Sequence, residues 1–154
     1  MCLRTWFCKR FCKPEPPDED MPEPAYLTEV DLSRLIGELN SLSAGTPVYL
    51  TDRSYKTTSV MELQRYLKYD LTDKNQYVHE YYDCDDYSFS LLGNISNPLW
   101  GMLPFGVIWV VRDNQPPHAC NIFVDDNYKI WCVEPQNDEV FDLPDDWKPY
   151  LIMI

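Results

Sequence analysis

Three side chains that can do covalent chemistry stand at well-separated positions in the chain. Cys84 lies in Asp83-Cys84-Asp85-Asp86-Tyr87 ahead of an apolar segment, His118 opens a strand-like segment, and Glu134 closes the next one. A cysteine nucleophile needs a base that takes its proton and a third group that holds the base in one tautomer. The residue types therefore predict a catalytic centre of Cys84, His118 and Glu134, which only the fold can bring together.

Cys84 is expected in the first turn of a helix that begins at Asp83 or Cys84 and ends at Gly93. The free N–H groups and the dipole of a first turn favour an anion, and so favour a thiolate. Neighbouring carboxylates act against the thiolate. The dipole and a protonated histidine must therefore outweigh these acids.

The strand-like segments 118–124 and 128–134 flank Asp125-Asp126-Asn127, a sequence typical of turns. They predict a β-hairpin. His118 and Glu134 stand at the outer ends of its two strands and are expected to lie side by side. A carboxylate at that place orients the imidazole.

The remaining pattern predicts one domain of helices followed by strands. Capping patterns predict helices from Asp31 to Asn40 and from Ser59 to Tyr69. Residues typical of strands then dominate, and they predict an antiparallel sheet. The expected strands are 106–112, 119–124, 128–134 and 150–154.

The order and spacing of these motifs resemble the transglutaminase-like cysteine proteins. The matching residues are Cys84-Asp85-Asp86-Tyr87-Ser88 with Leu91 and Leu92, then His118-Ala119, then Glu134-Pro135. The resemblance covers about a third of the chain and implies an α+β fold of the papain/transglutaminase type, with N-terminal helices packed on an antiparallel sheet.

By that resemblance Cys84 is the nucleophile, His118 the general base and then acid, and Glu134 the orienting group. The implied activity is that of a cysteine hydrolase or acyltransferase on amide bonds, with a peptide or amide substrate and neither cofactor nor metal. The family usually has aspartate as its acidic member, so glutamate adds one methylene here. For the oxyanion, the backbone N–H of Cys84, Gln76 and Tyr82 are candidates by position alone.

Composition divides the chain near residue 25. Residues 1–13 are basic and aromatic, and 14–24 are rich in proline and acids. We expect 1–24 to be an N-terminal arm with a spacer, and 25–154 to be the domain. The arm suits a membrane surface or a protein partner, and acylation of Cys2, Cys8 or Cys12 would strengthen membrane contact.

The 154 residues carry a net charge of −12, which argues against nucleic-acid partners because phosphates would be repelled. No apolar run reaches the roughly 18 residues of a membrane span, and no secretory signal stands at the start. A cytoplasmic location is expected, with membrane association through the arm. Oligomeric state is left open.

Three alternatives remain at this level. The first is a noncatalytic scaffold or assembly protein, docked in a virion or on a membrane, in which Cys84 and His118 need not meet. The second is a carbohydrate-binding module, for which exposed Trp100 and tyrosines would line a groove beside an occluded Cys84. The third is a hard-cation site, whose acids would be Asp83, Asp85, Asp86, Asp125, Asp126 and Glu134.

Overall fold

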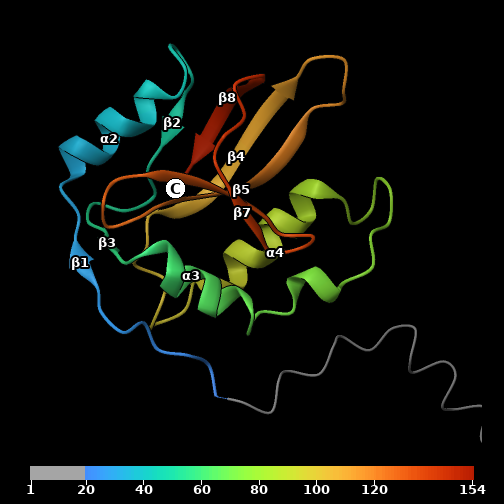
Figure 1. Ribbon diagram of the computed structural model, residues 1–154. Coiled ribbons are helices and arrows are strands. Elements are labelled where there is room, and N and C mark those ends of the chain that lie inside the picture. Colours follow the sequence, from blue (N-terminus) through green and yellow to red (C-terminus); the bar gives the residue numbers. More distant parts are fainter. Residues whose placement is uncertain (1–19) are drawn as a thin grey trace, which may run out of the picture.

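The protein is described here by a computed structural model that places residues 20–154 (Figure 1). The predicted basic arm and most of its spacer therefore lie outside the described residues. The helices are α2 (Leu32–Ser41), α3 (Val60–Leu67), the 3₁₀ turn η1 (Thr72–Lys74) and α4 (Cys84–Ile95). The strands are β1 (Thr28–Glu29), β2 (Val48–Tyr49), β3 (Lys56–Thr57), β4 (Phe105–Arg112), β5 (His118–Val124), β6 (Ile130–Glu134), β7 (Glu139–Phe141) and β8 (Trp147–Met153).

A six-stranded sheet in the order β2-β8-β4-β5-β6-β7 organises the domain, and β1 pairs with β3 in a separate ribbon. The β2–β8 pair is parallel and the other pairs are antiparallel. Gly106 allows β4 and β8 to approach closely, since a Cβ there would lie 1.9 Å from the Met153 carbonyl oxygen.

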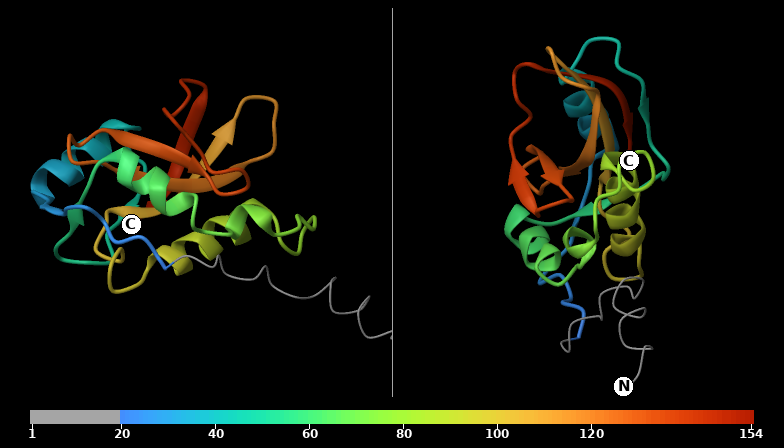
Figure 2. Two further views of the ribbon diagram at one scale, coloured as in Figure 1. Left: turned by 60° about the horizontal axis from the view of Figure 1, so that its bottom comes forward. Right: turned by 90° about the vertical axis from the view of Figure 1, so that its right-hand side faces the viewer.

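Helices cover both faces of this sheet (Figure 2). Side chains alternate along each strand, so Cys120 and Ile122 of β5 pack in one core with Leu35 and Leu39 of α2. Phe123 of the same strand packs in a second core with α3 and α4. All seven residues of β5 are buried, which makes this strand the centre of the fold.

Local signals fix the helix starts. The Asp31 carboxylate accepts hydrogen bonds from the backbone N–H groups of Ser33 (2.8 Å) and Arg34 (3.1 Å), and Ser59 caps α3. The predicted helices and the β5–β6 hairpin are confirmed. The predicted end of α4 at Gly93 is wrong, because the helix continues through Gly93 to Ile95.

The predicted fold class, an α+β fold of the papain/transglutaminase type with N-terminal helices on an antiparallel sheet, is wrong. The main element is the sheet, which is mixed because β2 runs parallel to β8. The helices are short, at 8 to 12 residues, and lie on both faces. In residues 20–154, no helix has the length and hydrophobicity needed to cross a bilayer.

Candidate functional site

His118 and Glu134 form a close pair at the end of the β5–β6 hairpin. The imidazole Nε2 lies 2.8 Å from Glu134 Oε2, and the two side chains are only 10% and 16% exposed. Asn121 pairs with Val133, so the position opposite Glu134 is Cys120, and His118 lies two residues further along on the same face. Such a diagonal spans about 7–8 Å between Cα atoms, and the longer glutamate side chain bridges it.

Cys84 is the first residue of α4, and hydrogen bonds hold the backbone in place before and after this residue. The Asp83 backbone N–H donates to Asp86 Oδ2 (3.2 Å), which closes the first turn. One turn on, the Ser88 hydroxyl donates to the Cys84 carbonyl oxygen (2.8 Å), while Asn121 Nδ2 of β5 donates to the Ser88 carbonyl oxygen (2.9 Å). The buried Asn121 therefore ties the thiol end of α4 to the strand of His118.

The Cys84 side chain also interacts with the imidazole of His118. Burial of the ring lowers its pKa, but the hydrogen bonds to Cys84 and Glu134, with the charges of both groups, outweigh burial and raise the pKa to about 9. At neutral pH the ring is then favoured as imidazolium. Because Glu134 engages Nε2, Nδ1 is the ring nitrogen left for the thiol.

Two residues that sequence reasoning missed complete the surroundings. Gln136 Nε2 donates to Glu134 Oε1 at 3.2 Å, so the carboxylate is held on both oxygens. Trp147 of β8 packs edge-on against the His118 ring, with the centroids 5.5 Å apart. Gln136 follows Glu134 by two residues and was within reach of a local argument, whereas the position of Trp147 depends on sheet pairing.

The acids around Cys84 are not equivalent. Asp85 hydrogen-bonds to Asp83, and this contact, with burial, raises the pKa of the Asp85 carboxyl. Asp83, Cys84 and Asp85 offer ligand atoms within 4.8 Å of one another, as do His79, Glu80 and Asp83. These are the described groups that could hold a metal ion. The wider cation set considered above is not assembled, because Asp125 accepts bonds from its own turn and from Trp131.

The other candidates that the sequence offered are exposed or have other hydrogen-bond partners. His79 is an exposed residue beside Glu80, with 3.8 Å between Nε2 and Oε1. Gln76 is exposed, and the Tyr82 hydroxyl is engaged by Asn75 (2.9 Å) and Ser90 (2.9 Å). Neither side chain is shown at a position that would serve an oxyanion.

A groove of about 500 Å³ lies along the exposed face of α4, between this helix and the segment around η1. Its lining consists of Leu71, Thr72, Asn75, Tyr82, Phe89, Ser90, Gly93 and Asn94. The expectation that Trp100 lines a carbohydrate groove is wrong, because this ring is only 1% exposed. Tyr82 alone of the predicted aromatic set lines the groove.

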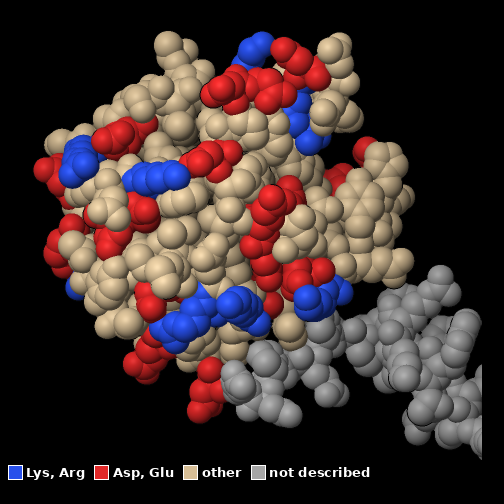
Figure 3. Space-filling view, viewed as in Figure 1, with Lys and Arg blue, Asp and Glu red and all other residues tan. Residues whose placement is uncertain are grey.

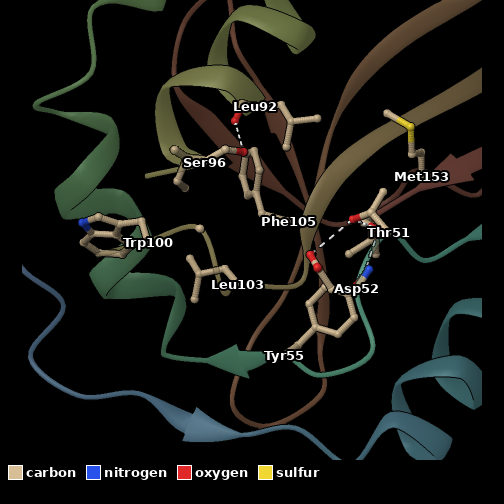
Figure 4. A pocket seen from close by; sticks show the side chains of 12 residues that line it. Thr51, Asp52, Tyr55, Leu92, Ser96, Trp100, Leu103, Phe105 and Met153 are labelled. Atoms are coloured by element: carbon tan, nitrogen blue, oxygen red, sulfur yellow. Dashed lines mark hydrogen bonds between the residues drawn. The ribbon is translucent and has the colours of Figure 1, made fainter. Parts of the chain in front are cut away.

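A second cavity, of about 230 Å³, lies between the C-terminal half of α4 and the end of β8 (Figure 4). Trp100, Leu103 and Phe105 form apolar walls, and Thr51 and Asp52 stand at its edge. The Thr51 and Tyr55 hydroxyls both donate to the Ile154 carbonyl oxygen at 3.0 Å. Its polar groups thus mainly serve the fold.

Carboxylates are spread widely over the face of the domain shown in Figure 3, with lysine and arginine side chains gathered in smaller groups. This distribution agrees with the net charge of −12. The surface therefore disfavours anionic ligands wherever no local cation compensates.

The chain was compared with known proteins. No family model matches it, and no curated protein matches it. A solved structure described as "PSL1a-E64 complex" matches with a TM-score of 0.71 at 20% identity, over 82% of this chain and 51% of the other. A structure of Polyporus squamosus lectin bound to the epitope Neu5Acα2-6Galβ1-4GlcNAc matches with a TM-score of 0.61 at 18% identity, over 77% and 48%.

These matches establish the fold, and the chain spans about half the length of the structures it matches. They overturn the resemblance to transglutaminase-like and papain-like proteins, because the matched structure whose description names a kind of protein is a lectin. Two predictions that rested on this resemblance are therefore also wrong. They are the activity of an amide-bond hydrolase or acyltransferase, and the peptide or amide substrate. The partner that a matched structure names is a glycan epitope.

Proposed function

We propose that Cys84 is a nucleophilic thiol, with His118 as the base that takes its proton and Glu134 as the group that positions the ring. The observation that carries this proposal is the row formed by the Cys84 side chain, the His118 imidazole and Glu134, in which 2.8 Å separates the ring from Glu134 Oε2 and Cys84 acts on the same ring. Because both His118 and Glu134 are largely buried, the row is held in one arrangement.

The chemistry follows from the row. The thiol proton moves to the ring, and the thiolate sulfur forms a bond to an electrophilic carbon, whose leaving group departs with the bonding electron pair. Glu134 keeps the imidazolium oriented and compensates its charge. The first turn of α4 favours the thiolate from the other side, through its free N–H groups and dipole.

The test is alkylation of Cys84 with iodoacetamide across pH 5 to 9, in which a carbon–sulfur bond forms and iodide leaves. Intact mass gives the extent of reaction, and peptide mapping assigns it among the six cysteines. We expect Cys84 to react at pH 6 to 7, and His118→Ala to slow this reaction at least tenfold. Cys120 and Cys132 are fully buried and serve as internal controls.

Labelling of Cys84 with the pH profile of an ordinary thiol, unchanged by His118→Ala, would contradict the proposal. E64, named in the description of one matched structure, is a second probe. An adduct of E64 on Cys84 that disappears in Cys84→Ser would support the same site with a bulkier reagent.

A second candidate function is glycan binding. A matched structure is described as a lectin with a bound epitope, and this chain has a groove lined by hydroxyl, amide and aromatic groups. Titration of the protein with Neu5Acα2-6Galβ1-4GlcNAc and with Galβ1-4GlcNAc, followed by NMR shifts or native mass spectrometry, tests it. Failure of both saccharides to bind at millimolar concentration would remove this candidate and leave the thiol proposal standing.

A further inference from the structure

We infer that the groove along α4 is a binding site for a neutral sugar ring, and that it prefers neutral glycans to sialylated ones. This inference rests on the second candidate function and assigns it a place. The site is separate from the Cys84 thiol. Ser90 follows Cys84 by six residues, which is about 9 Å along the helix axis.

The lining of the groove is uncharged throughout, although the chain carries a net charge of −12. None of the eight lining residues is an acid or a base. A volume of about 500 Å³ lies within the range of small-molecule sites, roughly 300 to 1,000 Å³. A ligand that fills such a space without charge must be recognised by hydrogen bonds and by apolar contact.

The hydrogen-bonding groups of the groove are ordered but not saturated. Asn75 Nδ2 donates to the Tyr82 hydroxyl, and that hydroxyl donates to Ser90 Oγ, both at 2.9 Å. Within residues 20–154, no protein acceptor takes the Ser90 hydroxyl proton, and no donor reaches Asn75 Oδ1. Ser90 and Asn75, which both line the groove, therefore keep one donor and one acceptor for a ligand, which suits the vicinal hydroxyls of a sugar ring.

Phe89 supplies the apolar contact. Its ring is 45% exposed although it lies on a helix, and it is braced by Trp109 with the centroids 5.7 Å apart. An exposed, braced aromatic ring offers a flat surface to the C–H face of a pyranose. Apolar ring, hydroxyl and amide thus occur together on one side of α4, because residues 89, 90, 93 and 94 share a helical face.

The absence of charge predicts the preference among glycans. A sialic acid carboxylate would find no cation in the groove lining, and the acidic surface of the domain repels it. Galβ1-4GlcNAc, which lacks that carboxylate, should therefore bind more tightly than the sialylated trisaccharide named for the matched lectin.

The test uses Gly93→Leu, because a side chain at Gly93 meets nothing within 4 Å and projects into the groove. Gly37 of α2 is also in a helix and also meets nothing within 4 Å, so Gly37→Leu is a matched control. Both changes favour the helix over glycine, so folding is expected to be kept. The ligands are Galβ1-4GlcNAc and Neu5Acα2-6Galβ1-4GlcNAc, followed by NMR titration of the full chain.

The expected result is binding of the neutral disaccharide with shifts at Phe89, Ser90 and Asn94, a loss of at least tenfold in Gly93→Leu, and no change in Gly37→Leu. Iodoacetamide labelling of Cys84 should be the same in all three proteins. Glycan binding that Gly93→Leu leaves intact, or equal or tighter binding of the sialylated ligand, would overturn the groove assignment while glycan binding itself stood. No binding of either saccharide to the unmodified chain would overturn both, and the labelling result would still decide the thiol proposal separately.

Discussion

Two pairs of largely buried ionisable groups lie near the C-terminal end of β6, and they are arranged in opposite ways. His118 and Glu134 have opposite charges, lie 2.8 Å apart, and have further partners in Cys84 and Gln136. Asp73 and Asp138 have the same charge, and one carboxylate oxygen of each is buried without a partner among the described residues. Opposite charges and hydrogen bonds therefore outweigh burial and stabilise charge in the first pair, whereas burial and like charges disfavour charge at Asp138 in the second.

Asp138 is the clearer member of the second pair. Burial, followed by the charges of Asp73 and Asp70, raises the pKa of its carboxyl to about 7, against the opposing charge of Lys74. The residue also has φ = 60°, a left-handed conformation in the turn between β6 and β7. The surroundings of His118 thus stabilise the charged form of its ring. The surroundings of Asp138 stabilise the neutral form of its carboxyl.

The largest expected effect is the pH dependence of stability due to His118. Its folded pKa of about 9 exceeds the ordinary 6.5, so its stabilising contribution is complete below pH 6.5 and is lost as the pH rises to about 9. The contribution is up to about 3 kcal/mol. Urea unfolding of the unmodified protein and of His118→Gln between pH 6 and 9.5 should show the difference between them shrinking by that amount.

His79→Gln is the matched control, since His79 is 78% exposed and its change should leave the pH profile as it is. A His118→Gln protein that keeps the pH slope of the unmodified chain would show that His118 and Glu134 are not an ion pair in solution.

Asp138→Asn is expected to have the next largest effect. The raised pKa means that folding is favoured by the protonated carboxyl, and stability falls as pH rises from about 4 through 7. Asparagine removes this cost and keeps a residue that accepts positive φ. Unfolding free energy should increase by about 1–2 kcal/mol at pH 8, after allowance for partial exposure, and by less than half of that at pH 5.

Asp142→Asn is a suitable comparison, since that side chain is 72% exposed and only pairs with Lys129. Equal effects of Asp138→Asn at pH 5 and pH 8 would mean that packing, rather than charge, explains the change.

The sequence predicted the features that depend on adjacent residues and missed those that depend on distant contacts. The α4 start, the Asp-Asp-Asn turn and the contact of His118 with Glu134 were predicted, because each depends on a few adjacent residues or on hairpin geometry. The chemical roles of Cys84, His118 and Glu134 remain predictions. The parallel β2–β8 pairing, β7 and the position of Trp147 were missed, because short strands acquire partners only through distant contacts.

The Asp73–Asp138 pair and the groove were missed for the same reason, since both depend on how η1 approaches the sheet or α4. The family resemblance was wrong because it rested on short motifs over a third of the chain. Short motifs describe a local arrangement of side chains and do not specify the order of strands in a sheet.

Glu134→Asp tests whether the His118–Glu134 pair depends on the length of the acidic side chain. It keeps the charge and removes one methylene from the side chain that bridges the diagonal to His118. We expect the shorter carboxylate to lose the 2.8 Å contact, so that Cys84 alkylation at pH 7 slows about tenfold, or roughly 1.4 kcal/mol. Glu139→Asp, at an exposed residue of β7, is the matched control, and equal rates in both variants would show that charge alone is sufficient.

The smallest expected effect is that of Asp85→Asn, which removes a negative charge next to the thiol. A nearby carboxylate disfavours the thiolate, so its loss should speed Cys84 alkylation at pH 7 two- to fivefold, or up to about 1 kcal/mol. Because the Asp83 contact and burial already raise the pKa of Asp85, the gain should be smaller at pH 5, where Asp85 is charged for less of the time. Glu38→Gln, on the exposed side of α2, removes the same charge elsewhere and should leave the rate unchanged. A slower reaction in Asp85→Asn would show that this carboxylate assists the thiol rather than opposing it, and would place the acids of the α4 N-terminus with Glu134 as supporting groups.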